Sequence, residues 1–339
     1  MPRIWGARSL APIYPHQANL SEPIGEAWLT GPECEIATGP LQGALSSAWQ
    51  KMPPGWRGTD FTAQPNTSGF PLLIKFIFPA DQLSIQVHPG DAYARENEAP
   101  NALGKTEMWH AVSAEPGSTL LLGFKPGVDR AKLLQAIETS KLEDLFQRWL
   151  VCPGDTFYVP AGIPHTIGAG VVLCEVQQNS DLTYRLYDFN RVDARRKPRE
   201  LHIEKSLAVI DFSEKTGGKL APVALPSSHG AKKSLLVACP YFASERWDIS
   251  AENRANSDPA RFELLVILKG DGKLRSADES YSYRQGECWF VPAQLGQFSL
   301  QPGQATSILR TYVPNIGQMR ADLSRSGAQE SAVEKVFFS

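Results

Sequence analysis

Two closely spaced pairs of polar residues and one histidine could bind a divalent metal. Gln86 and His88 lie two residues apart in LSIQVH, and Lys105 and Glu107 lie two apart in GKTEMW. Residues two apart on a strand face the same side of a sheet. His165 follows a turn in GIPHTIG. Neutral imidazole and carboxylate are ligands of Zn²⁺, and Fe²⁺, Mn²⁺ or Ni²⁺ suits the same set. Gln86, His88, Glu107 and His165 therefore form a candidate metal site.

The segment that follows His165 carries further candidates. In CEVQQNSDLTYRLYDFNR (174–191), Glu175 and Gln177 share one face, and Arg185 and Tyr187 share another after a predicted turn. An ordinary hairpin with a cross-strand ion pair explains the same spacing. Taken singly, a buried hydrogen-bonded histidine or a surface carboxylate explains each metal candidate as well. Convergence of these segments in one barrel would favour the functional interpretation.

The elements that must position these side chains are mostly short strands. Prolines and glycines (26 and 27 residues) separate apolar or alternating runs, which is typical of an all-β sandwich or barrel. The clearest runs are 71–78, 83–88, 119–124, 156–160, 171–178, 263–268 and 288–292. Helical spacing predicts two helices over 129–150, divided by a capping box at Ser140 and Glu143. It also predicts a short helix at 202–212, and composition predicts a linker over 213–233.

An internal repeat predicts two domains. PGDTFYVPAGIPH (153–165) resembles QGECWFVPAQLGQ (285–297), and His165 falls on Gln297 when the two are overlaid. No histidine follows His229, so the second copy cannot supply imidazole ligands. We expect a catalytic domain at 1–225, with a helical insertion at about 128–150. We expect a degenerate domain without metal ligands at 226–339.

Composition narrows the class of protein. With 339 residues, 42% hydrophobic residues and a net charge of −2, the chain has no electrostatic signature of nucleic-acid or anionic-membrane binding. Five scattered cysteines without a CxxC pair favour a reduced, cytoplasmic location. No apolar run has the length of a signal peptide or a membrane helix. We expect a monomer or a weak homodimer.

Eight segments together resemble the type I mannose-6-phosphate isomerases, in the short bacterial form built on cupin barrels. The resemblance covers roughly the first 210 residues, and the C-terminal third shares only the cupin-like repeat. The segments are, in order, RIWG (3–6), PIGEAW (23–28), FPLLIKFI (70–77), LSIQVHP (83–89), GKTEMW (104–109), GDTFYVPAGIPHTIG (154–168), EVQQNSDLTYRLYDFNR (175–191) and RELHIEK (199–205). HPGD (88–91) departs from many relatives at Gly90, in a turn.

The resemblance implies a mainly β fold with two jelly-roll barrels and one Zn²⁺ bound by Gln86, His88, Glu107 and His165. It implies interconversion of mannose 6-phosphate and fructose 6-phosphate through a cis-enediol(ate). Arg185, Lys105 and Glu175 fall on active-site positions of the family. The base is Glu175 or Lys105, and the sequence does not decide between them. Ser84, Lys105 and Arg185 are the candidate substrate-binding residues.

Two other classes of protein remain open from the residues alone. A cupin oxygenase would use a similar barrel with Fe²⁺ and O₂, but its common site has three histidines and a glutamate. A sugar-binding cupin protein would have lost turnover, but here the ligand set, Lys105 and Arg185 are all present. An isomerase for a different phosphosugar is the third alternative, since the motifs define the chemistry better than the sugar.

Overall fold

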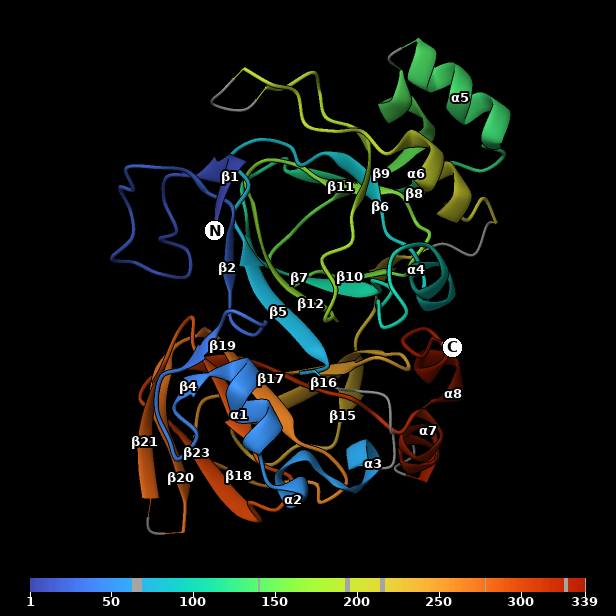
Figure 1. Ribbon diagram of the computed structural model, residues 1–339. Coiled ribbons are helices and arrows are strands. Elements are labelled where there is room, and N and C mark those ends of the chain that lie inside the picture. The colour runs from blue at the N-terminus through green and yellow to red at the C-terminus, as the bar shows by residue number, and fades with distance from the viewer. Residues whose placement is uncertain are drawn as a thin grey trace. The chain divides into compact units, whose positions relative to one another are not determined.

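The computed structural model describes residues 1–62, 69–139, 141–192, 196–213, 217–277, 279–325 and 329–338. The chain divides into two compact units (Figure 1). Unit 1 contains Met1–Ala27 and Lys75–Lys219, and unit 2 contains Trp28–Ile74 and Leu220–Ser339. Strands dominate both units, so the predicted mainly β class is confirmed.

Two sheets carry the candidate site residues of unit 1. In the first, β7 pairs antiparallel with both β10 and β12. Its order is β14 (Gly218–Leu220), β10 (Thr156–Val159), β7 (Glu107–Ala114), β12 (Val171–Gln178), β5 (Leu72–Ile77) and β2 (Glu26–Trp28). The order of the second is β13 (Tyr184–Tyr187), β6 (Ile85–Val87), β11 (His165–Ile167), β8 (Thr119–Phe124) and β9 (Phe146–Leu150). The strand β1 (Pro2–Ala7) precedes them.

Unit 2 repeats this arrangement. One sheet has the order β15 (Val223–Leu225), β16 (Ala231–Ala238), β17 (Ala243–Ile249), β24 (Thr306–Tyr312), β19 (Glu263–Lys269) and β22 (Cys288–Val291). The other has the order β18 (Asn253–Asn256), β23 (Gln297–Pro302), β20 (Asp271–Ser276) and β21 (Glu279–Arg284). A small pair, β3 (Glu35–Ile36) and β4 (Gly43–Ala44), lies apart from these sheets.

The strand order shows that the repeat extends beyond the matching segments. The series β10-β7-β12-β5 of unit 1 recurs as β22-β19-β24-β17, and β6-β11-β8-β9 recurs as β18-β23-β20-β21. Each strand corresponds to the one twelve places later in the chain. The two units therefore have the same strand topology over eight consecutive strands.

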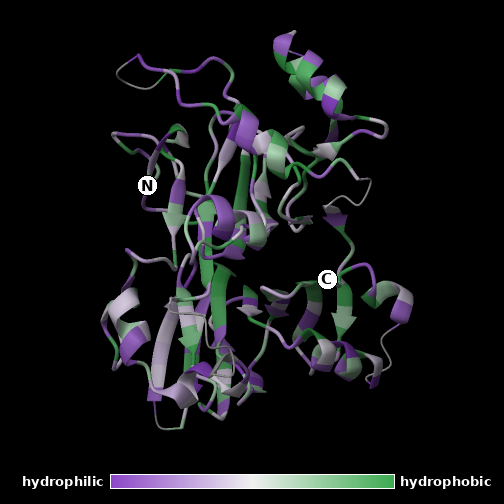
Figure 2. Cartoon of the chain, turned by 45° about the vertical axis from the view of Figure 1, so that its right-hand side comes forward, coloured by the Kyte–Doolittle hydropathy of each residue, from purple (hydrophilic) through white to green (hydrophobic). Residues whose placement is uncertain are grey.

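Continuous apolar runs produce the most buried strands. Every residue of β5 is buried, and β12 is buried except at Val172. Figure 2 shows such strands as long hydrophobic stretches. One buried cluster of unit 1 joins Trp109 of β7 to Leu122 of β8 and Ile167 of β11, so residues of both sheets form a common core. A strand with both faces buried loses the alternating pattern and becomes apolar throughout.

The helices are short and mostly peripheral. They are α1 (Leu45–Lys51), α2 (Pro54–Arg57), α3 (Thr59–Thr62), α4 (Asp91–Asn97), α5 (Arg130–Glu138), the 3₁₀ helix η1 (Leu142–Leu145), α6 (Ile203–Val209), α7 (Ile316–Arg325) and α8 (Glu330–Val333). The helix predicted at 202–212 is confirmed by α6. The side chain of Asp129 caps α5 by accepting from the Lys132 N–H.

The second helix predicted within 129–150 is wrong for Phe146–Leu150, which form β9. The open edge of β8 pairs with this segment, and Phe146 packs against Phe124 with ring centroids 5.0 Å apart. Sheet pairing thus overrides a spacing that also fits a helix. Ser140 of the proposed capping box lies outside the described residues.

The predicted linker at 213–233 is also wrong in part, because it includes β14, β15 and the start of β16. Residues 214–216 of that linker lie outside the described part of the chain. The units divide between Lys219 and Leu220, and residues 28–74 belong to unit 2, whereas the sequence predicts one boundary after 225. In unit 2, Trp49 packs edge-on against Phe70 and Phe262, with centroids 5.1 and 5.5 Å away. The sequence around Trp49 gives no indication of this packing against a residue far along the chain.

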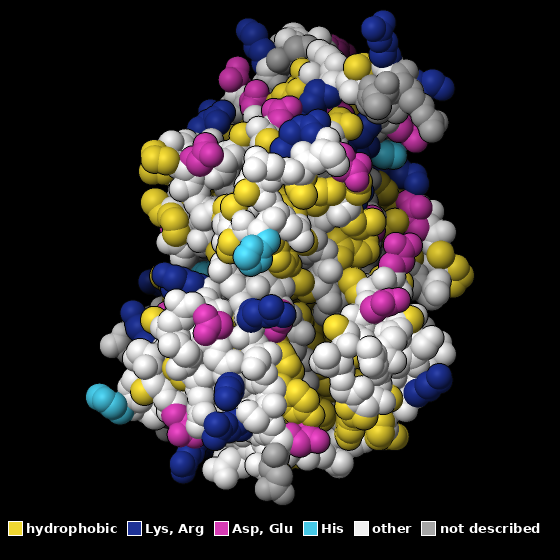
Figure 3. Space-filling model, turned by 90° about the vertical axis from the view of Figure 1, so that its left-hand side faces the viewer, with side chains coloured by type: hydrophobic (Ala, Val, Ile, Leu, Met, Phe, Trp, Pro, Cys, Tyr) yellow, Lys and Arg dark blue, Asp and Glu magenta, His cyan; other side chains and the backbone are white. Residues whose placement is uncertain are grey.

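No helix within the described ranges is long and apolar enough to cross a membrane. On the face shown in Figure 3, basic and acidic side chains are interspersed.

Candidate metal centre and catalytic cavity

Strands of both sheets of unit 1 position the candidate ligands. Gln86 is the central residue of β6, and it pairs with His165, the first residue of β11. His88 directly follows β6, and Glu107 opens β7 in the other sheet. The pairing of β6 with β11 joins segments 79 residues apart in the chain, so the convergence depends on long-range sheet topology.

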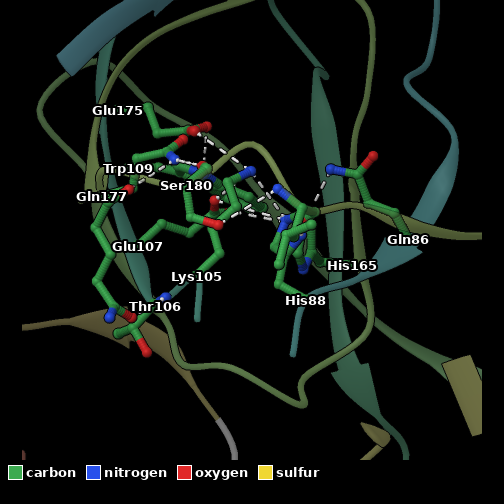
Figure 4. Close-up of polar contacts among 12 residues, drawn as sticks. Gln86, His88, Lys105, Thr106, Glu107, Trp109, His165, Glu175, Gln177 and Ser180 are labelled. Atoms are coloured by element: carbon green, nitrogen blue, oxygen red, sulfur yellow. Dashed lines mark hydrogen bonds and ion pairs between the residues drawn. The ribbon is translucent and has the colours of Figure 1, made fainter. Parts of the chain in front are cut away.

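His88, Glu107 and His165 lie close enough to share one ion. A donor atom from each lies within 4.8 Å of the other two, and all three residues are buried. The imidazole centroids are 4.9 Å apart. His88 Nε2 lies 3.7 Å from Glu107 Oε2, and His165 Nε2 lies 3.4 Å from Glu107 Oε1. Figure 4 shows the two imidazoles side by side.

Backbone carbonyls orient both imidazoles. His88 Nδ1 lies 2.7 Å from the Leu182 carbonyl oxygen, and His165 Nδ1 lies 2.9 Å from that of Ile163. A carbonyl only accepts, so each Nδ1 carries the proton and each Nε2 keeps a lone pair directed at the cluster. Burial lowers the pKa of His165 to about 4 and that of His88 well below its ordinary value. Both rings are therefore neutral near pH 7, as metal ligation requires.

Gln86 lies at the edge of this cluster. Its Nε2 is 3.4 Å from His165 Nε2, and its Oε1 accepts a hydrogen bond from Ser84 Oγ at 3.1 Å. Rotating the terminal amide by half a turn exchanges these two atoms. The carbonyl oxygen would then face the cluster as a fourth donor.

A buried cation already lies beside the three ligands. Lys105 Nζ lies 3.1 Å from His88 Nε2 and 3.1 Å from Glu107 Oε2. Close packing at the preceding residue fixes this segment, because a Cβ on Gly104 would lie 2.6 Å from the Asp91 nitrogen. The Gly104 N–H also donates to Asp91 Oδ1 at 2.7 Å.

The donor set fits a divalent metal. Glu107 Oε2 is buried and accepts no hydrogen bond, although it is ion-paired with Lys105. An unsatisfied carboxylate oxygen facing two neutral imidazole nitrogens is an environment that a cation stabilises. His88, Glu107 and His165 can therefore hold a divalent ion, and Gln86 lies within reach of the same position.

A cavity of about 750 Å³ opens beside this cluster, and all its lining residues belong to unit 1. Gln86 and Lys105 line it, which links the cavity to the ligands. Ser84, Glu175 and Arg185, the other predicted site residues, line it as well. The volume and the polar lining suit a small, highly hydroxylated ligand.

Glu175 is the most buried carboxylate of the cavity wall. It lies opposite Trp109 in the β12–β7 pairing, and Trp109 Nε1 donates to its Oε2 at 3.1 Å. Its Oε1 lies 3.0 Å from Lys75 Nζ and 3.9 Å from Lys105 Nζ. Burial, and then repulsion from Glu107, raise the pKa of Glu175, although both lysines oppose the shift. A raised pKa suits a carboxylate that must exchange a proton near neutral pH.

Arg185 lies opposite Gln86 in the β13–β6 pairing. It is half-buried, and its Nη1 donates to the Glu200 carbonyl oxygen at 2.7 Å. Its Nε is buried without a hydrogen-bond partner, and no carboxylate lies within ion-pair distance among the described contacts. This guanidinium can therefore bind an anionic oxygen in the cavity.

Several charged residues of the cavity wall were not predicted from the sequence, and Lys75 is the most buried of them. Lys75 and Glu26 line the cavity and form an ion pair at 3.7 Å. Arg3 and Arg199 also line it. A lysine within the apolar run LLIKFI was a usable signal, because a buried lysine needs a partner. That partner comes from other strands.

Comparison with known proteins identifies relatives of this chain. Residues 232–313 match the family model described as the cupin domain of mannose-6-phosphate isomerase. The chain is 32% identical over 312 residues to mannose-6-phosphate isomerase ManA of Bacillus subtilis, covering 88% of this chain and 92% of that protein. This chain belongs to the mannose-6-phosphate isomerase family. The family's enzyme from Streptococcus mutans is 37% identical over 226 residues, covering 67% of this chain and 69% of that one.

Solved structures support the same relationship. The crystal structure of mannose 6-phosphate isomerase from Bacillus subtilis superposes with a TM-score of 0.82 at 29% identity, covering 92% of this chain and 96% of that one. A variant of phosphomannose isomerase from Salmonella typhimurium has a TM-score of 0.68 at 18% identity, covering 92% of this chain and 97% of that one. The second likeness establishes a shared fold only. The fold shared with mannose 6-phosphate isomerase thus extends over both units.

Proposed function

We propose that this protein interconverts mannose 6-phosphate and fructose 6-phosphate through a cis-enediol(ate). One observation carries the proposal: in a chain of this family, Lys105, Glu175 and Arg185 line one cavity beside the cluster of His88, Glu107 and His165. The reaction moves a proton between C2 and C1 of the open-chain sugar. It therefore needs a base, and groups that stabilise negative charge on the two oxygens.

Gln86, His88, Glu107 and His165 would hold the metal, for which we propose Zn²⁺. When bound, the ion would supply Lewis-acid stabilisation of the developing negative charge. The backbone carbonyls of Leu182 and Ile163 keep both imidazole Nε2 atoms directed at the ion position. Ser84 would steady the amide of Gln86 and contact the substrate at the cavity wall.

Arg185 would bind the oxygens of the diol. It lies opposite Gln86 in the β13–β6 pairing, and side chains of directly paired residues project from the same face of a sheet. A guanidinium stays charged and can donate to two oxygens at once. Its unpartnered Nε and its lack of a carboxylate partner among the described residues leave it available for the substrate.

Glu175 is our choice for the base over Lys105. Its pKa is raised, chiefly by burial, and its carboxylate lies at the cavity wall. Lys105 contacts Glu107 and His88 directly. We assign it to balancing the charge of the ligands and to contacting the substrate. A carboxylate with a raised pKa can take the C2 proton and return it at C1 without leaving the cavity.

We further propose that each unit is a cupin-type jelly-roll barrel, with α5 and η1 as an insertion in the first. The recurrence of strand order supports this proposal. The domains would be 1–225 and 226–339, modified by the packing of residues 28–74 with unit 2. The five cysteines, all in the described part of the chain, form no disulfide bond, which supports a cytoplasmic location. We propose a monomer or a weak homodimer.

The decisive experiment measures turnover of mannose 6-phosphate together with bound metal. The wild-type protein should convert the substrate to fructose 6-phosphate and carry one divalent ion per chain. His88→Ala should lose the ion and at least about 10²-fold in turnover, because it removes a ligand and the charge stabilisation that depends on it.

His229→Ala is the matched control, since His229 is an exposed histidine of unit 2. It should keep both metal and turnover. Full activity in metal-free His88→Ala would refute the role of the metal. Absence of any conversion by the metal-loaded wild-type protein would refute the proposed reaction.

A further inference from the structure

We propose that Lys75, a residue of β5 outside the predicted site, is a positioning residue that holds the carboxylate of Glu175 in place for proton transfer and favours its ionised form. The inference rests on the isomerase function proposed above and goes beyond it by assigning a residue that acts through the base.

The contacts of Lys75 are those of a fixed structural cation. Its side chain is 3% exposed, and its Nζ lies 3.0 Å from Glu175 Oε1 and 3.7 Å from Glu26 Oε1. Every other residue of β5 is buried as well, so the ammonium group has little freedom to move. A buried ammonium group would be costly without partners. Here the two carboxylates keep the pKa of Lys75 above its ordinary value despite burial.

Lys75 belongs to a row of alternating charges that runs along the cavity into the metal centre. The members of the row are, in order, Arg3, Glu26, Lys75, Glu175, Lys105 and Glu107. The N···O distances between successive members are 2.6, 3.7, 3.0, 3.9 and 3.1 Å. Glu175 therefore lies between two lysines, and Lys75 is the nearer of the two.

The groups around Glu175 have opposing effects on its ionisation. Lys75 from β5 and Lys105 before β7 favour the carboxylate, and Trp109 donates a hydrogen bond to it. Burial and Glu107 disfavour it, and they prevail. Glu26 competes with Glu175 for the same ammonium group, and Asp181 adds a more distant negative charge on Lys75. Lys75, the nearer of the two lysines, therefore opposes the desolvation that disfavours the carboxylate form of Glu175.

Lys75→Met is the direct test. Methionine keeps the length and removes the charge, so the pKa of Glu175 should rise. Since the base must be ionised to act, the acidic limb of the pH profile of kcat/KM should move to higher pH. An opposite charge this close typically shifts a carboxyl pKa by about 1–3 units, so we expect a displacement of about that size. Bound metal should be unchanged.

Two further variants separate positioning from a general structural effect. Lys75→Arg retains the charge and should restore the limb to its wild-type position. Glu26→Gln frees Lys75 from its second carboxylate, so the limb should move the opposite way, to lower pH. If Lys75→Met fails to fold, these two variants still decide the question. A Glu26→Gln limb that stays in place would overturn the proposal.

Lys233→Met is the matched control. Lys233 is a half-buried lysine of unit 2 that lies over the Trp247 ring at 3.8 Å, so its loss tests charge removal without contact with Glu175. It should leave the limb in place. A raised KM with an unmoved limb in Lys75→Met would mean that Lys75 binds substrate itself, and the proposal would fail. Inactivity of the wild-type protein would instead refute the isomerase function.

Discussion

The two units have the same strand topology but bury opposite arrangements of charge. Glu107 opens β7 and pairs with Val159, and Glu263 opens β19 and pairs with Val291. The two carboxylates are therefore equivalent in register, and both are buried. In unit 1 the partners of Glu107 are two imidazoles and a lysine. In unit 2, Arg310 donates to Glu263 through Nε at 2.9 Å.

The neighbouring strands carry charges of opposite sign in the two units. In unit 1, Trp109 is two residues after Glu107 and pairs with Glu175 of β12. In unit 2, Leu265 is two residues after Glu263 and pairs with Arg310 of β24. Lys75 pairs with Glu175 at 3.0 Å in unit 1, and Glu245 pairs with Arg310 at 2.9 Å in unit 2. A buried charge pair thus persists with its polarity reversed. In unit 2 the cation beside the buried carboxylate of Glu263 is a guanidinium of the chain itself. In unit 1 the equivalent carboxylate, Glu107, can bind an exchangeable metal cation.

The positions equivalent to the other ligands differ between the units as well. The pairing of β18 with β23 sets Asn256 opposite Gln297, as that of β6 with β11 sets Gln86 opposite His165. Asn256 and Gln297 are exposed. Two residues on, Asp258 stands where unit 1 has His88, and it pairs with Arg261 at 2.9 Å. Unit 2 therefore lacks both imidazoles at the equivalent positions, and the guanidinium of Arg310 neutralises its buried carboxylates.

The largest expected effect is a loss of stability in unit 2 when the buried guanidinium of Arg310 is removed. Arg310→Met leaves Glu245 and Glu263 buried without their cation, and breaking such a network typically costs about 3–5 kcal/mol. Urea denaturation should show that loss in the free energy of unfolding, while metal bound by unit 1 stays unchanged. Arg246→Met, which removes a partly exposed partner of Asp248, should cost less than about 1 kcal/mol. Equal stabilities for the two variants would contradict the comparison.

The corresponding arginine test in unit 1 should affect turnover and spare stability. Arg185→Ala removes the group assigned to the diol oxygens, so kcat should fall by about 10²–10³-fold, while the ion remains bound. Metal analysis and a coupled assay measure the two effects. Arg148→Ala, at an exposed position of β9, should leave both unchanged. If Arg185→Ala lost the ion as well, the arginine would be part of the metal site.

The smallest expected effect is a difference in pH dependence between the two units. In unit 2, burial opposes ionisation of Glu245, but Arg310, Tyr312 and Trp247 prevail and lower its pKa below 4.5. Its stabilising contribution is therefore complete above pH 4.5 and is lost as the pH falls through the depressed folded-state value. Glu175 has a raised pKa, so in metal-free protein its contribution declines as the pH rises from 4.5 through the raised value.

Each unit of pKa difference corresponds to about 1.4 kcal/mol. Glu245→Gln should flatten the dependence of stability on pH below 4.5, and Glu175→Gln should flatten it above that value. Denaturation of metal-free protein across the pH range measures both. Identical profiles for the two variants would mean that the reversal of charge has no energetic consequence.

Much of the strand content could be predicted from sequence because apolar runs bounded by proline and glycine leave few alternatives. The repeat around Val159 and Val291 correctly indicated two copies of one β unit, which the strand order extends. The helix prediction was wrong at Phe146–Leu150 because an apolar spacing of three and four residues also fits a helix. The pairing of this segment with the edge of β8 decides in favour of a strand. Residues 28–74 were assigned to the first domain because their packing partners lie more than 180 residues away, as Phe262 does from Trp49.

In the candidate site, residue types and sequence spacing predicted the polar residues that lie in closely spaced pairs. His88, Glu107 and His165 do converge within 4.8 Å. Lys75 and Glu26 were missed because each is the lone charged residue of its strand, and their partners become visible only through cross-strand contacts. The role of Arg310 could not be predicted for the same reason: an arginine within β24 gives no sign of the two carboxylates that it contacts.

The surroundings of Trp109 have a practical consequence. Its indole donates to the carboxylate of Glu175 and meets the ring of His165 edge-on, with centroids 5.2 Å apart and planes at 77°. The chromophore therefore touches both the proposed proton acceptor and a proposed ion-binding ring. With the chain's seven other tryptophans replaced, its fluorescence would serve as an internal optical reporter, able to time ion uptake and ligand arrival separately within one protein.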